Sequence, residues 1–140
     1  AHKLSILTSL AFGCEVNFNA VHIEGISQLS PLDIEFAEDL GYRIKLLGIA
    51  CQTEAGVEQR VHPCMVPVDS PIAHIEDVFN AVVAEGDFVG TTMYEGRGAG
   101  EGPTSSAVVA DIIDIAQNRI LNTFTVPATK LKQSKIIPIS

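Results

Sequence analysis

Three consecutive stretches in the middle of the chain decide the fold: Tyr42-Arg-Ile-Lys-Leu-Leu-Gly-Ile-Ala-Cys-Gln52, Thr53-Glu-Ala-Gly56 and Val57-Glu-Gln-Arg-Val-His-Pro-Cys-Met-Val66. The first and third stretches are rich in branched apolar residues, which favour extended strands. The short stretch between them ends in glycine, which is typical of a tight turn. The sequence therefore predicts two strands, Tyr42–Gln52 and Val57–Val66, that fold back on each other.

Helical patterns precede this pair of strands. Residues 2–12 predict a helix in which Leu4, Leu7 and Ala11 share one face, and Lys3, Leu7 and Leu10 share a neighbouring face. Ser30-Pro31-Leu32-Asp33 combines a capping residue, a proline in the first turn and an early acid, which is typical of a helix start. Gly41 is expected to end that second helix, and Val21–Glu24 predicts a short strand before it.

The part of the chain after the strand pair repeats these signals. Ser70-Pro71 predicts a short helix through Phe79, and Gly86-Asp87 predicts a two-residue hairpin turn between Ala81–Glu85 and Phe88–Glu95. We therefore expect an α+β domain with a mixed, largely antiparallel sheet and helices on one face.

A glycine-rich loop follows at Gly96-Arg-Gly-Ala-Gly-Glu-Gly-Pro-Thr-Ser-Ser106 and leads into a long apolar-periodic helix. Glycines let a ligand approach the main chain, and an open helix start favours an anionic or polar ligand. The loop does not fit the dinucleotide pattern G-x-G-x-x-G, because Pro103 occupies the place of the third glycine. A ligand-contacting loop and a simple chain reversal are both open readings of this segment.

Composition narrows the class of protein. The 140 residues carry a net charge of -8 and 46% hydrophobic residues, which fits a globular domain and argues against nucleic-acid binding. The three widely spaced cysteines predict no disulfide framework, and the four histidines have no metal-ligand spacing. We expect a cytoplasmic protein without a membrane span. All 17 acids precede residue 115, so the basic segment 121–140 is expected to be a linker or tail.

Three segments make the chain resemble homoserine dehydrogenases: Ser30–Ala50, Phe79–Val83 and Gly96–Asp111. The likeness extends over about residues 1–120, in order and with matching spacing. It corresponds to the carboxy-terminal part of the family's substrate domain, without its nucleotide-binding domain. The resemblance implies an oxidoreductase that interconverts L-homoserine and L-aspartate 4-semialdehyde with NAD or NADP, toward threonine and methionine.

The resemblance also implies site residues. Lys3 aligns with the lysine of the family motif Asp-x-x-x-Lys, which is proposed as the acid/base, and the motif's aspartate would lie before Ala1. Such a lysine can pass a proton to or from a hydroxyl as hydride leaves. The alternative is that Lys3 only lays its stem over Leu7 with its ammonium in water.

For the cofactor, the resemblance implies contacts from Gly98, Ala99 and Gly100, and no metal. It divides the chain into a partial substrate and dimerisation domain (1–95), a loop and helix that return to the nucleotide-binding domain (96–120), and the tail (121–140). A homodimer through the sheet is expected. The alternative function is a non-catalytic α+β association module that binds no cofactor.

Overall fold

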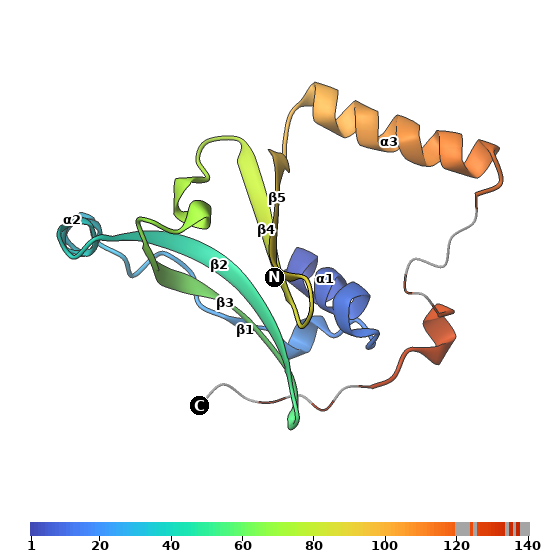
Figure 1. Cartoon of the computed structure of the whole chain (residues 1–140), viewed down its shortest axis with the longest axis horizontal. Helices are drawn as coiled ribbons and strands as arrows, with labels where there is room; N and C mark the ends of the chain where they lie inside the picture. Colours follow the sequence, from blue (N-terminus) through green and yellow to red (C-terminus); the bar gives the residue numbers. More distant parts are fainter. Residues whose placement is uncertain (120–123, 125, 134, 136, 138–140) are drawn as a thin grey trace. The chain divides into compact units, whose positions relative to one another are not determined.

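The chain folds into two compact units, each described here by itself (Figure 1). The computed structural model describes residues 1–119, 124, 126–133, 135 and 137. One unit comprises Ala1–Met65 with Leu121–Ser140, and the other comprises Val66–Ile120. Helices and mixed, largely antiparallel strands confirm the α+β class.

The first unit is built on a three-stranded sheet with the order β1-β3-β2. Strand β2 (Tyr42–Thr53) and strand β3 (Gly56–Pro67) form the predicted pair, and the two residues between them require antiparallel pairing. Strand β1 (His22–Ile23) adds on the other edge of β3 and runs parallel to it, with His22 opposite Arg60.

Two helices pack against strand β2 of this sheet. Leu4 of α1 (His2–Phe12) lies 3.5 Å from the place where a Cβ on Gly48 would stand. Ala37 of α2 (Pro31–Asp39) lines a hollow together with Ile44. Because Ile44 and Gly48 are an even number of residues apart on β2, both helices pack on the same side of the strand.

The start of α2 agrees with the sequence prediction. The Ser30 hydroxyl accepts a bond from the backbone N–H of Asp33 at 3.2 Å, and the Asp33 carboxylate accepts one from the Ser30 N–H at 2.8 Å. Pro31 occupies the first turn, and Gly41 follows the helix with φ +80°. Reciprocal bonds of this kind satisfy donors that a helix start would otherwise leave unpaired.

In the second unit, the predicted helix from Ser70 to Phe79 is wrong. Only a 3₁₀ turn, η2 (Pro71–His74), forms, and Ser70 makes no side-chain cap with it. Asp77 has φ +54°, a left-handed conformation that a helix cannot contain. Phe79 instead begins strand β4.

The hairpin that follows is present, but its turn differs from the prediction. Strand β4 (Phe79–Gly86) pairs with β5 (Gly90–Arg97), from Phe79 opposite Arg97 to Gly86 opposite Gly90. The turn therefore holds Asp87, Phe88 and Val89 rather than Gly86-Asp87. Gly90 takes φ +73°, as three-residue hairpin loops require after their turn.

The last long helix, α3 (Glu101–Ala116), starts two residues before Pro103. Pro103 therefore lies in the first turn of α3, where its missing N–H is not needed because no helical bond is made. Gly100 is the residue that precedes the helix.

Candidate active site

Lys3, the predicted acid/base, lies in the first turn of α1. Its side chain is exposed, and the helix begins without a side-chain cap. The neighbouring His2 ring stacks on Phe18 with 4.0 Å between centroids and 5° between planes. This stack fixes the first turn of α1 against the 3₁₀ turn η1 (Phe18–Ala20), so that Lys3 projects from an anchored position.

The buried side of α1 is polar, which corrects the apolar stripe predicted from the sequence. Ser5, Thr8 and Ser9 are buried, whereas Leu7 is 43% exposed. The hydroxyls are accommodated because they bond to carbonyl groups: Ser5 to His2 at 2.9 Å, Thr8 to Leu4 at 2.8 Å, and Ser9 to Cys14. A hydroxyl that is paired in this way can be buried at little cost.

Gly98 opens the predicted cofactor loop directly after β5. Its N–H donates to the carbonyl of Val78 at 3.0 Å, which continues the hairpin by one bond. A Cβ at Gly98 would lie 2.6 Å from the side-chain carbon Cγ of Asn80, so the close approach of Asn80 requires glycine. Arg97 lies over the Phe79 ring, 5.2 Å from its centroid, and holds the base of the loop.

Gly100 is constrained by its backbone rather than by crowding. Its φ of +120° lies in a region that residues with a Cβ rarely adopt. A Cβ there would meet only the ring of Pro103, at 3.5 Å. No side chain caps α3, and Gly98, Ala99 and Gly100 are all exposed. Glycine at 100 thus leaves the helix start open, as an anion-binding start requires.

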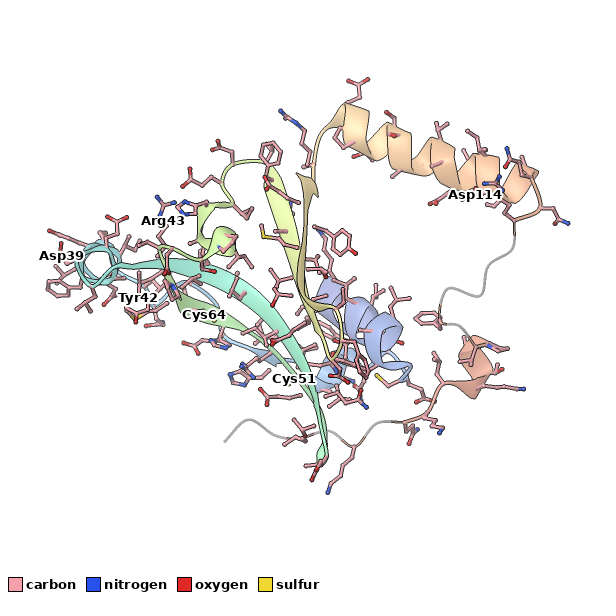
Figure 2. The ribbon with its side chains drawn as sticks, viewed as in Figure 1. Asp39, Tyr42, Arg43, Cys51, Cys64 and Asp114 are labelled. Carbon is pink, nitrogen blue, oxygen red and sulfur yellow. The ribbon has the colours of Figure 1, made fainter. Side chains whose placement is uncertain are left out.

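Helix α3 presents apolar side chains on more than one side. Within Glu101–Ala116 no residue is buried, and the exposed set includes Val108, Val109, Ile112, Ile113 and Ile115. Figure 2 shows side chains projecting from α3 in several directions, among them Asp114. These exposed valine and isoleucine side chains form an apolar surface on α3.

The two predicted parts of the site belong to different units. Lys3 belongs to the first unit, and the Gly98–Gly100 loop belongs to the second.

Sequence reasoning did not single out a hollow of about 400 Å³ beside α2. Asp33 lies at its rim, but its bonds from Ser30 lower the pKa of this carboxyl and commit it to the helix cap. Burial raises the pKa of the Cys64 thiol, which also lines the hollow, and the charge of Arg60 offsets part of this rise. A thiol with a raised pKa is a poor nucleophile at neutral pH, so neither group points to catalysis.

The three cysteines are free, in agreement with the absence of a disulfide framework expected from the sequence. Cys14 is buried, whereas Cys51 is exposed and lies toward the β2–β3 turn, away from Cys64 (Figure 2). In the described part of the chain, the helices are too short or too polar to cross a membrane.

Comparison with known proteins decides the family. The family model described as homoserine dehydrogenase matches residues 1–113. The chain belongs to the homoserine dehydrogenase family. Among relatives, the homoserine dehydrogenase of Neisseria gonorrhoeae is 54% identical over 116 residues, covering 83% of this chain and 27% of that protein. The Pseudomonas aeruginosa enzyme is 52% identical over 117 residues, with 84% and 27% covered.

Solved homoserine dehydrogenases share the fold. The structure of the enzyme from Thiobacillus denitrificans matches with a TM-score of 0.88 and 46% identity, covering 98% of this chain and 33% of that one. One from S. aureus matches with a TM-score of 0.77 and 37% identity, covering 84% and 30%. The chain thus spans about a quarter to a third of the length of these homoserine dehydrogenases.

Proposed function

We propose that this chain supplies part of the catalytic domain of a homoserine dehydrogenase. The reaction is the interconversion of L-homoserine and L-aspartate 4-semialdehyde with NAD or NADP, a step toward threonine and methionine. The observation that carries the proposal is the family match over residues 1–113, which includes both Lys3 and the Gly98–Gly100 loop. Both lie at helix starts, and both are exposed.

In this proposal, Lys3 moves the proton. Oxidation of the primary alcohol removes a hydride from the carbon and a proton from the oxygen. An uncharged Nζ of Lys3 accepts the hydroxyl proton, and in the reverse direction the ammonium returns it to the developing alkoxide. The His2–Phe18 stack supports this role, because proton transfer requires a held donor position.

The loop at Gly98, Ala99 and Gly100 would hold the nicotinamide cofactor. Two observations fit: the start of α3 is uncapped, and Gly100 adopts φ +120°, a conformation that favours glycine. Main-chain N–H groups at such a place can bind a phosphate or a polar ligand edge. When bound, the cofactor supplies the hydride acceptor.

Helix α3 would pack on the nucleotide-binding domain that the family's longer members contain. Its exposed aliphatic residues support this assignment, since a helix that is apolar on several sides is normally covered on several sides. Residues 96–120 would then return to that domain, while residues 1–95 stay in the substrate domain.

A homodimer through the sheet is the second part of the proposal. Within the described first unit, α1 and α2 lie on the side of β2 that carries Ile44 and Gly48. The opposite side of β2 carries Leu47 and Ile49, both half-buried, and is the side on which we propose that a second copy docks. Sedimentation of the chain and of its Ile49→Lys variant tests this: the variant should be monomeric and the parent dimeric.

The test of function is a chimera in which this chain replaces the matching segment of the Neisseria gonorrhoeae homoserine dehydrogenase. We expect the chimera to reduce NAD or NADP in the presence of L-homoserine, and the 140-residue chain alone to show no turnover. A folded chimera without homoserine-dependent reduction would refute the proposal and favour an association module.

A further inference from the structure

A basic segment near the carboxyl end is tied to the first unit at two places. We call this segment the strap: Pro127–Gln133 with Lys135 and Ile137. At the first place, the N–H of Glu15 donates to the carbonyl of Lys132 at 3.0 Å, and Cys14 pairs with Lys132 as an isolated parallel bridge. At the second, the N–H of Val57 donates to the carbonyl of Lys135 at 3.0 Å, and that of Ile137 to the carbonyl of Val57 at 3.4 Å.

Gly56 is the residue that lets the strap reach β3. A Cβ at this position would overlap the carbonyl oxygen of Lys135 and lie 3.0 Å from its carbonyl carbon. Backbone atoms cannot move aside as a flexible side chain can, so any side chain at position 56 must displace the strap. Gly56 also has φ +147°, within the range that favours glycine.

Cys14 lies under the other place of contact, just after α1. It is 4% exposed, and its thiol faces the Thr8 carbonyl at 3.9 Å. Lys132 of the strap forms a backbone bridge with Cys14, so release of the strap would expose one side of Cys14. The same helix carries Lys3 at its other end.

The strap is held more weakly than the strands. The described contacts are three backbone hydrogen bonds and the half-buried side chains of Leu131 and Ile137, and the other described strap residues are exposed. Lys130, Lys132 and Lys135 make it basic, whereas residues 1–65 contain 8 acids against 4 basic residues. Segments with few buried contacts open locally without global unfolding.

We propose that the strap is a releasable latch. When it is docked, it closes the edge of β3 beside Gly56 and covers Cys14 at the carboxyl end of α1. When it is released, both become accessible while the β2–β3 hairpin and α1 stay folded. The latch is independent of the proposed function, because none of the contacts between described strap residues and the first unit involves Lys3 or the glycine loop.

The test measures how fast the Cys14 thiol reacts with 5,5′-dithiobis(2-nitrobenzoate). The full chain carries Cys51→Ser and Cys64→Ser, so that Cys14 is the remaining thiol. Gly56→Ala should raise the labelling rate about tenfold or more, because access then follows local opening rather than global unfolding. A chain that ends at Lys130 should show the same rise with Gly56 intact.

Gly41→Ala is the matched control. Gly41 has φ +80°, and a Cβ there would meet nothing within 4 Å, so the variant carries backbone strain without touching the strap. Its labelling rate should stay that of the parent. The proposal is overturned if the chain ending at Lys130 labels as slowly as the parent. It is also overturned if that chain loses its circular dichroism signal, since the strap would then be an integral part of the fold.

Discussion

Helices α1 and α3 have similar apolar content in sequence but differ in what they bury. Helix α1 buries Ser5, Thr8 and Ser9 beside β2, and its hydroxyls are bonded to nearby carbonyls. Helix α3 has five exposed valine and isoleucine residues, and none of Glu101–Ala116 is buried. The polar side of α1 is therefore buried, whereas the apolar side chains of α3 are exposed.

This difference shows that apolar periodicity predicts a helix better than it predicts the partner of that helix. Both helices also begin at a proposed functional residue, Lys3 in α1 and Gly100 before α3. The proposed function places the chemical step at the start of α1 and cofactor affinity at the start of α3.

The largest expected effect is at Lys3. In the chimera, Lys3→Ala should lower kcat by about 10²–10⁴-fold, because a general acid/base is lost, and should leave the KM for the cofactor nearly unchanged. Steady-state kinetics with varied cofactor measure both.

Lys3→Met separates the two readings of this residue. Methionine keeps an apolar stem over Leu7 but carries no ammonium. A loss of kcat equal to that of Lys3→Ala supports proton transfer, whereas near-normal kcat would mean that Lys3 only covers Leu7.

The next largest effect is at Gly100. Gly100→Val should raise the KM for the cofactor by roughly five- to a hundredfold, since holding a residue with a Cβ in a sparsely populated conformation costs about 1–3 kcal/mol. The sheet should stay folded.

Gly90→Val is the control for Gly100. Gly90 also has a positive φ, +73°, with no atom within 4 Å of an added Cβ, but it begins β5 directly after the hairpin turn, at the opposite end of that strand from the glycine loop. The Gly90→Val variant should lower the free energy of unfolding and leave the KM for the cofactor unchanged. Equal loss of stability in both variants, with the KM unchanged, would make the glycine loop a turn only.

A smaller effect is expected on the free energy of unfolding of the 140-residue chain, where one variant in α1 is compared with one in α3. Ser9→Ala removes the donor that pairs with the Cys14 carbonyl in a buried place and should cost about 1–3 kcal/mol. Ile112→Ser, on exposed α3, should change stability by less than about 0.5 kcal/mol. Urea unfolding measures both, and a larger loss for Ile112→Ser would show that α3 is packed within the chain.

The smallest effect is the pH dependence of the α2 cap. Bonds from Ser30 lower the pKa of Asp33, so this carboxylate stabilises the fold above its unfolded pKa, about 3.9, and the contribution is lost as the pH falls through the folded value. Asp33→Ala should therefore lower Tm at pH 6 and have little effect at pH 3. A Tm difference that is the same at both pH values would contradict this role.

The sequence predicted the elements that depend on interactions between residues close together in the chain. The β2–β3 pair follows from branched apolar strands and one short turn, and the α2 start follows from Ser30, Pro31 and Asp33. The family resemblance, confirmed by the match over residues 1–113, came from three segments and the spacing between them.

The wrong predictions depend on contacts between distant residues or on positions that several residues tolerate. The helix expected at Ser70–Phe79 fails at Asp77, whose positive φ a sequence pattern does not reveal. The Asp87–Val89 turn is set by the register that pairs Gly86 with Gly90. The role of Gly56 depends on Lys135, which lies far along the chain. The assignments of Lys3, Gly98, Ala99 and Gly100 stay predictions.

Hydrogen exchange of α3, measured by mass spectrometry, tests the comparison most directly. In the 140-residue chain, the amides of Glu101–Ala116 should exchange much faster than those of α1, because no tertiary burial protects α3. In the chimera, α3 should become as protected as α1, because the nucleotide-binding part then covers its valine and isoleucine residues. Equal protection of α3 in the chain and in the chimera would contradict the account.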